Sequence, residues 1–193
     1  MEDISKDYKI WFPYEVFYIE SMLTITSMVM YEIDLLELSI EKHNKEELEG
    51  EKIIDLSQNI ITSAAAISRF FWPSSNNSIH KKRGQRLREA FDIIESNVLK
   101  KRDVRNFIEH FDEKLDVYLS TIANGMIFPL YVGPRPVDHD LAQFFRAYFT
   151  NDHTFKLLDL ECSMVPIIDE LIRVHNLLLT FQNDGGRLPI KSS

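Results

Sequence analysis

Four polar residues within six positions combine side chains that can carry out phosphodiester chemistry. Arg105, Asn106, Glu109 and His110 occur in one segment, and a helical rotation of about 100° per residue places them away from its apolar stripe. That stripe is the expected core face: Val104, Phe107, Ile108, Phe111, Leu115, Tyr118 and Leu119. The polar face is therefore predicted to point away from its own core.

The residue types on this face suit metal-independent cleavage of RNA. A histidine with a pKa near 6.5 can accept or donate a proton at neutral pH. An arginine can hold a phosphate through two hydrogen bonds and stabilise a pentacoordinate transition state. RNA supplies its own nucleophile, the 2′-OH. The alternative interpretation is a solvated helix face with an Arg105–Glu109 pair at i,i+4.

A basic segment precedes this motif. Residues 80–105 contain nine Lys or Arg and four acidic residues, within a chain of 193 residues whose formal net charge is −8. A local positive patch on an acidic body can attract phosphate, although a solvated helix and loop would have the same composition. The cations that we predict to bind RNA are Lys81, Lys82, Arg83, Arg86 and Arg102.

Other common chemistries are not indicated. The six glycines form neither a dinucleotide-binding fingerprint nor a phosphate loop. Cys162 lies in an apolar run and is predicted to be a buried structural thiol, while Asp138-His139-Asp140 lack a second ligand pair and are interpreted as a solvated helix start. His43, His153 and His175 are interpreted as helix-end, turn and core-flanking residues. We therefore expect no metal and no cofactor.

The length and composition predict one domain over residues 1–182, followed by a flexible tail at 183–193. With 45% hydrophobic residues the chain can form a core without disulfides. The N-terminus resembles no secretory signal, and acidic residues interrupt the most apolar stretch. We expect a cytoplasmic protein without membrane association.

Hydrophobic spacing predicts a mainly α protein, a four- or five-helix up-and-down bundle with a small β-hairpin before the last helix. The hairpin lies in an insertion at about 141–162, with strands at 144–150 and 154–160, although 141–148 could instead be helical. Prolines and glycines between 125 and 136 indicate a loop. The expected helices are 14–44, 45–72, one from 78 that includes Val98, 103–121 and 164–181.

The segment Arg105-Asn106-Phe107-Ile108-Glu109-His110 resembles the R-N-x-x-x-H form of the motif of the HEPN superfamily (higher eukaryote and prokaryote nucleotide-binding domains). The resemblance covers about 14–121, leaving the last helix open, and extends to the following Phe111-Asp112-Glu113-Lys114-Leu115-Asp116 and to Ser68-Arg69-Phe70-Phe71-Trp72-Pro73. It implies a helical bundle that pairs as a homodimer. The two motif helices would line a shared cleft, which in active members cuts RNA without metal and leaves a 2′,3′-cyclic phosphate.

By the same resemblance, Arg105 would bind the scissile phosphate, His110 would transfer protons and Asn106 would orient one of these groups. Glu109 has no role set by the motif and would support Arg105 or His110. A toxin or defence role with a cognate protein inhibitor is compatible with this prediction. Two alternatives remain: a non-catalytic HEPN-like bundle that binds a nucleotide, RNA or a protein, and a helical interaction protein with no nucleic-acid role.

Overall fold

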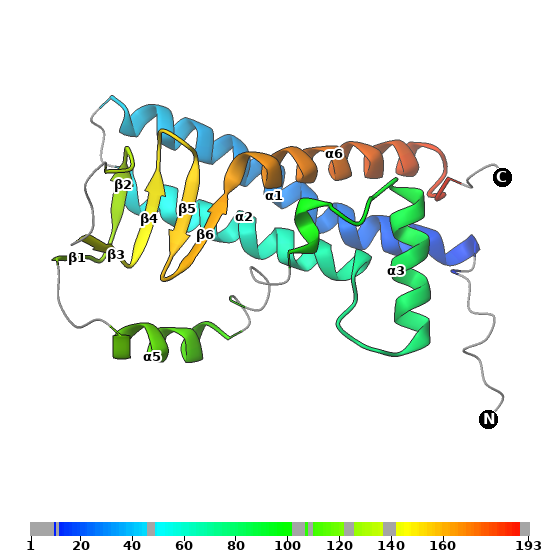
Figure 1. Cartoon of the computed structure of the whole chain (residues 1–193). Helices are drawn as coiled ribbons and strands as arrows, with labels where there is room; N and C mark the ends of the chain where they lie inside the picture. Colours follow the sequence, from blue (N-terminus) through cyan, green and yellow to red (C-terminus); the bar gives the residue numbers. More distant parts are fainter. Residues whose placement is uncertain are drawn as a thin grey trace. The chain divides into compact units, whose positions relative to one another are not determined.

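The computed structural model describes residues 10, 12–45, 49–101, 107, 110–121, 126–136 and 142–189. The chain is mainly helical, with a small β region before the last helix (Figure 1), which confirms the predicted fold class at this level. Within the described residues the α-helices are α1 (Glu15–His43), α2 (Gly50–Phe71), α3 (Ser78–Ala90), α5 (Phe111–Thr121) and α6 (Met164–Asn183).

The chain divides into two compact units. Unit 1 comprises residues 1–30, 63–100 and 169–193, and unit 2 comprises residues 31–62 and 101–168. Each unit has its own buried residues. The expectation of a single bundle over residues 1–182 stays a prediction.

In unit 1, α3 is shorter than the sequence predicted. The helix ends at Ala90, and Asp92 has a positive φ of 51°, in the left-handed region that Asp adopts more readily than most residues. The expected continuation to Val98 is therefore wrong: residues 98–100 form a separate 3-10 turn. The spacing that suggested one helix was that of Leu87, Phe91, Ile94 and Val98. Phe91 is buried directly after the end of α3, whereas Ile94 is 65% exposed.

Gly84 allows α3 to pack closely on the end of α2. A Cβ added at Gly84 would lie 2.5 Å from the Phe71 carbonyl oxygen and 2.8 Å from Pro73 Cδ. The Phe71 ring packs edge-to-face on the Phe91 ring, with centroids 5.3 Å apart. The Phe91 ring packs in the same way on the Phe181 ring at 5.0 Å. These rings are buried and form much of the unit 1 core.

The end of the chain belongs to unit 1 as far as Pro189. Leu188 is only 3% exposed, and its backbone N–H donates to a Glu15 carboxylate oxygen at 3.0 Å. The expectation of a flexible tail at 183–193 stays a prediction. The burial of Leu188 and the hydrogen bond of its backbone N–H are contacts that the turn residues Asn183-Asp184-Gly185-Gly186 did not indicate.

In unit 2, the predicted β-hairpin is present and is part of a larger sheet. Strand β4 (Arg146–Phe149) pairs antiparallel with β5 (Thr154–Leu157), and the turn between them includes His153 at φ 50°. The four-stranded sheet has the order β2-β4-β5-β6, with β2 at Tyr131–Gly133 and β6 at Leu160–Ser163. The helical alternative for 141–148 is therefore wrong.

Two short strands occupy the segment that the sequence predicted to be a loop. β1 (Met126–Phe128) pairs parallel with β3 (Ala142–Phe144), and β2 pairs parallel with β4, with partners sixteen positions apart in both cases. Pro129 lies between β1 and β2 and removes one backbone donor. Each strand is too short to show a periodic pattern, and its aromatic residues pack on a cluster around Phe144 and Phe149.

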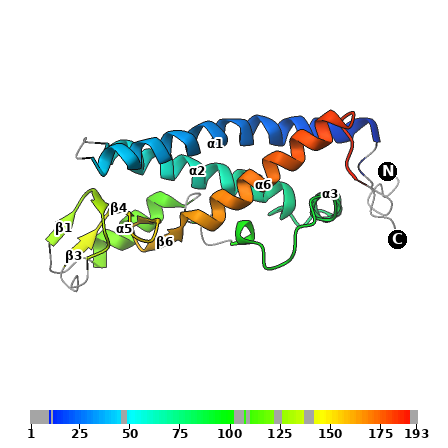
Figure 2. The same cartoon turned by 90° about the horizontal axis from the view of Figure 1, so that it is seen from above.

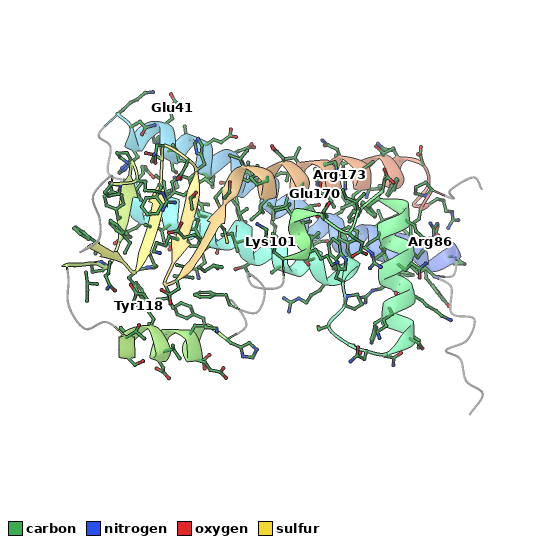
Figure 3. All side chains as sticks on the ribbon, in the orientation of Figure 1. Glu41, Arg86, Lys101, Tyr118, Glu170 and Arg173 are labelled. Atoms are coloured by element: carbon green, nitrogen blue, oxygen red, sulfur yellow. The ribbon has the colours of Figure 1, made fainter. Side chains whose placement is uncertain are left out.

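Helix α5 packs beside the strands of unit 2 (Figures 1 and 2). Tyr118 is buried and lies 6.3 Å from the Phe145 ring, pointing toward the strands (Figure 3). Phe107 is also buried, as predicted for the core stripe, but Leu119 is 57% exposed, so its prediction is wrong. Only a narrow part of α5 faces the sheet.

Within the residues that the structure describes, none of the helices combines the length and the apolar composition that a bilayer-spanning segment needs.

Candidate functional site

His110 is the motif residue whose surroundings the structure shows. It lies in a turn directly before α5, which begins at Phe111, so the predicted single helix over 103–121 is wrong at this residue. His110 is exposed, and its carbonyl oxygen accepts the Lys114 backbone N–H at 3.0 Å. Its Nδ1 is 3.8 Å from Glu113 Oε1. Because Glu113 is also exposed, this pair leaves the imidazole open to solvent and to a ligand. Arg102, Arg105, Asn106 and Glu109 lie outside the described residues.

The surface that continues from His110 along α5 is exposed and contains an unusual apolar residue. Glu113, Lys114 and Val117 lie on one side of α5 at a rotation of about 100° per residue, and His110 precedes them in the adjoining turn. Val117 is 60% exposed despite its aliphatic side chain. We call His110, Glu113, Lys114 and Val117 the α5 outer face. It has the composition of a polar surface with one hydrophobic contact point.

The predicted RNA-binding cations of α3 belong to unit 1, whereas His110 belongs to unit 2. Lys81 is exposed, and Lys82 and Arg83 are partly buried. The Arg83 guanidinium donates to the Arg69 carbonyl oxygen at 2.9 Å. The basic segment is therefore not uniformly solvated.

Arg86 is bound within its own unit. Its guanidinium donates to the carbonyl oxygens of Pro189 at 2.9 Å and Leu188 at 3.3 Å, and it lies 3.4 Å from a Glu15 carboxylate oxygen. Glu15 is 6% exposed. Arg86 therefore neutralises a buried carboxylate and fixes the chain after α6, which is a structural role that charge counting along the sequence did not indicate.

Glu170 and Arg173 form a second internal charge cluster in unit 1 (Figure 3). Two Arg173 nitrogens donate to the two Glu170 oxygens at 2.7 and 2.8 Å, and a third donates to the Phe91 carbonyl oxygen. Asn97 adds a 2.6 Å bond to Glu170. The hydrogen bonds that Arg173 donates to Glu170 raise the pKa of Arg173 above its ordinary value. The cluster holds the turn after α3 against α6.

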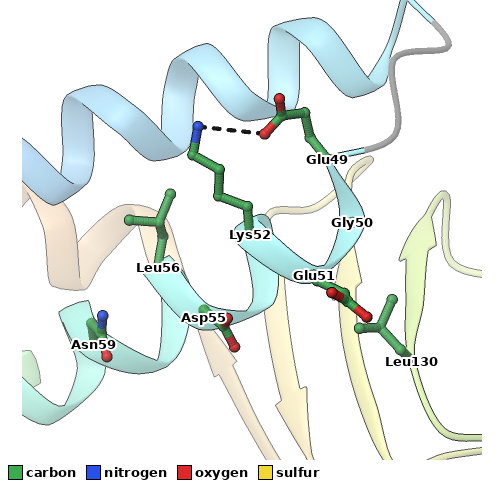
Figure 4. A pocket seen from close by; sticks show the side chains of 8 residues that line it. All are labelled: Glu49, Gly50, Glu51, Lys52, Asp55, Leu56, Asn59 and Leu130. Carbon is green, nitrogen blue, oxygen red and sulfur yellow. Dashed lines mark ion pairs between the residues drawn. The ribbon is translucent and has the colours of Figure 1, made fainter.

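A pocket in unit 2 was not predicted from the sequence (Figure 4). It has a volume of about 690 Å³ and lies at the start of α2, beside the loop residue Leu130. Glu49, Glu51 and Asp55 make its rim acidic, and Lys52 lies 3.4 Å from a Glu49 carboxylate oxygen. The acidic rim disfavours phosphate, so this pocket does not belong with the predicted RNA-binding residues.

The remaining reactive residue types have structural surroundings. Burial raises the pKa of the Cys162 thiol to about 11, which fits the prediction of a buried structural cysteine. His175 Nδ1 lies 2.9 Å from the buried Thr26 hydroxyl, and His43 Nε2 lies 3.2 Å from the Val132 carbonyl oxygen. The sequence Asp138-His139-Asp140 lies outside the described residues, and within the described ones no three His, Cys, Asp or Glu side chains are placed to hold a metal ion.

Comparison with known proteins adds no family assignment: no family model matches the chain, and neither curated proteins nor solved structures give a match.

Proposed function

We propose that the protein is a metal-independent endoribonuclease of the HEPN type, whose helices form an up-and-down bundle that acts as a homodimer. The observation that carries this proposal is the sequence Arg105-Asn106-Phe107-Ile108-Glu109-His110. The exposure of His110 directly before α5 supports it, because a proton-transfer residue must reach its substrate.

The proposed reaction needs only groups of the protein and the RNA. The 2′-oxygen attacks the adjacent phosphorus, the bond from phosphorus to the 5′-oxygen breaks, and the products carry a 2′,3′-cyclic phosphate and a 5′-OH. One His110 accepts the 2′-OH proton, and the His110 of the second copy protonates the leaving 5′-oxygen. Arg105 neutralises the charge that develops on the phosphate, and Asn106 orients it.

The α5 outer face supports pairing of two motif segments. Val117 follows His110 by seven residues, about two helical turns into α5, and both residues are exposed. An exposed valine in this position could be covered by the same face of a second copy, and in a two-fold dimer each His110 would lie near the shared interface. RNA and a cognate inhibitor remain the proposed partners, with a toxin or defence role.

The test compares purified wild-type protein with His110→Ala and with Asp116→Ala, which changes an exposed residue of α5 outside the α5 outer face. Each is incubated with total RNA in EDTA, and fragment ends are analysed for cyclic phosphate. We expect cleavage by wild type and Asp116→Ala, and a loss of about 100-fold or more for His110→Ala. Equal cleavage by all three proteins would indicate a contaminating nuclease and contradict the role of His110.

The second candidate is a non-catalytic HEPN-like bundle that binds RNA, a nucleotide or a protein. The internal contacts of Arg86 favour the protein-binding form of this candidate, since they remove one predicted cation from RNA binding. This candidate predicts no cleavage by folded wild-type protein, together with measurable binding of RNA or nucleotide. If the folded protein neither cuts nor binds RNA or a nucleotide, the remaining hypothesis is a helical interaction protein with no nucleic-acid role.

A further inference from the structure

A pocket in unit 1 is lined by two arginines and three apolar residues. It has a volume of about 310 Å³. We call it the Arg83 pocket; its lining residues are Ile25 of α1, Ala66, Arg69 and Phe70 of α2, and Arg83 of α3. Three helices of one unit therefore bring a strongly basic rim next to an apolar wall.

The Arg83 guanidinium is held in place without an acidic partner. It donates to the Arg69 carbonyl oxygen at 2.9 Å, and its Cζ lies 6.0 Å from the centroid of the Phe70 ring. Among the described residues, no carboxylate lies within ion-pair distance of Arg83, and its Nε is buried with no hydrogen-bond partner. Because Arg83 is partly exposed and its acceptor, the Arg69 carbonyl oxygen, is neutral, the guanidinium has donors left for an anion supplied by a ligand.

Arg88, five residues further along α3, has surroundings similar to those of Arg83 and can be compared with it. It also donates to a carbonyl oxygen at the end of α2, that of Phe71, and also lies over the following aromatic ring, 5.9 Å from the Trp72 centroid. Unlike Arg83, it has a carboxylate partner, Glu95, at 3.8 Å. The two sites repeat one arrangement, and within the described part of the chain only Arg88 has a carboxylate beside it.

We infer that the Arg83 pocket binds the phosphate group of a nucleotide, either free or as one residue of an RNA strand. Arginine offers several N–H donors in a fixed fork, so Arg83 can bind the phosphate oxygens. The apolar side of the pocket can bind the nucleobase, which would lie against the Phe70 ring. The volume is at the lower end of the range of about 300–1,000 Å³ for small-molecule sites. This site stands whether or not His110 cuts RNA.

The first experiment measures binding by the full chain carrying His110→Ala, so that cleavage cannot affect the result. The probes are adenosine 5′-monophosphate, adenosine and a fluorescent 12-nucleotide single-stranded RNA. We expect adenosine to bind at least tenfold more weakly than the monophosphate. Adding Arg83→Gln should weaken monophosphate binding at least tenfold, whereas Arg88→Gln, the matched loss of charge, should change it less than twofold. Circular dichroism verifies that both variants are folded.

A second variant tests the pocket without altering Arg83. Ala66→Met fills the space beside Phe70 and should weaken monophosphate binding at least fivefold. Competition between the monophosphate and the RNA would identify an RNA nucleotide as the ligand, and binding of the monophosphate alone would identify a free nucleotide. The inference is overturned if the folded protein binds neither phosphate-bearing probe, or if Arg83→Gln and Ala66→Met both bind as the parent does.

Discussion

Helices α3 and α5 are both rich in charge, but they use it in opposite ways. On α3, Arg86 and Arg88 donate to carbonyl oxygens of their own unit and face the carboxylates of Glu15 and Glu95. On α5, most side chains are exposed and Tyr118 is the buried anchor. A count of charges along the sequence therefore overstates the positive charge that α3 offers to RNA.

The difference arises from how closely each helix is packed. Gly84 lets α3 approach the last turn of α2, where carbonyl oxygens lack helical partners and attract cations. Helix α5 contacts the strands through few side chains, which leaves the α5 outer face open. Gly84→Ala, Arg86→Met and Val117→Asp test this comparison, and the Thr26–His175 pair adds a buried polar contact elsewhere in unit 1.

The largest expected effect is that of Gly84→Ala. The added Cβ would lie 2.5 Å from a backbone oxygen that cannot move alone, so we expect a loss of about 3 kcal/mol in the free energy of unfolding. Urea denaturation followed by circular dichroism measures it. Gln85→Ala, at the exposed neighbouring position, is the control and should change stability by less than about 0.5 kcal/mol. Equal stability of both variants would contradict the close packing of α3.

Arg86→Met should come next. It removes the cation beside the buried Glu15 carboxylate and the donor to two carbonyl oxygens, so we expect a loss of about 2 kcal/mol. Lys81→Met on the exposed side of α3 should cost less than about 0.5 kcal/mol. If the two variants were equally stable, Arg86 would be available for RNA, as the sequence suggested.

The contact between the Thr26 hydroxyl and the His175 imidazole in unit 1 can be tested by substitution and by the pH dependence of stability. Thr26→Val removes the hydroxyl and should cost about 1 kcal/mol in unfolding free energy at pH 7. Burial lowers the pKa of His175 below its ordinary value, so the unfolded chain binds a proton more readily than the folded one. Stability from this group is present above the unfolded pKa of about 6.5 and is lost as pH falls through the folded pKa.

Chemical denaturation between pH 7.5 and 5 should show a smaller loss of stability for His175→Gln than for wild type. His153→Gln serves as the comparison, because His153 is in the exposed turn before β5. An unchanged pH dependence in His175→Gln would argue against the burial of that imidazole as its cause.

The smallest effect on stability is expected for Val117→Asp. Because Val117 is 60% exposed, the unfolding free energy of the separate chain should change by less than about 0.5 kcal/mol. If the α5 outer face pairs two copies, the same substitution should convert a dimer into a monomer, since it buries a carboxylate in the interface. Sedimentation velocity measures this. A dimer that persists would place the interface elsewhere.

Long-range contacts explain which predictions were wrong. Local spacing was sufficient for α1, α2 and α6, because each repeats apolar residues over several turns. It was insufficient for β1 and β2, whose strands of three residues become regular only when paired with residues sixteen positions away. The burial of Leu188 likewise depends on Glu15, at the other end of the sequence.

The candidate sites divide in the same way. The motif around His110 was predicted from residue types and their spacing along the sequence. The Arg83 pocket could not be predicted in this way, because its residues come from three helices. Its distinguishing feature is also a difference in contacts: Arg88 has a carboxylate partner, and Arg83 has none among the residues that the structure describes.

The sequence by itself determined the helical character of the chain, the β-hairpin before α6 and the residues with potential for phosphodiester chemistry, because these depend on local periodicity and side-chain type. Only the tertiary structure decided which cations face solvent, which bind carbonyl oxygens and where pockets form. The physical reason is that a charge is available to a ligand only when no group distant in the sequence has already satisfied it.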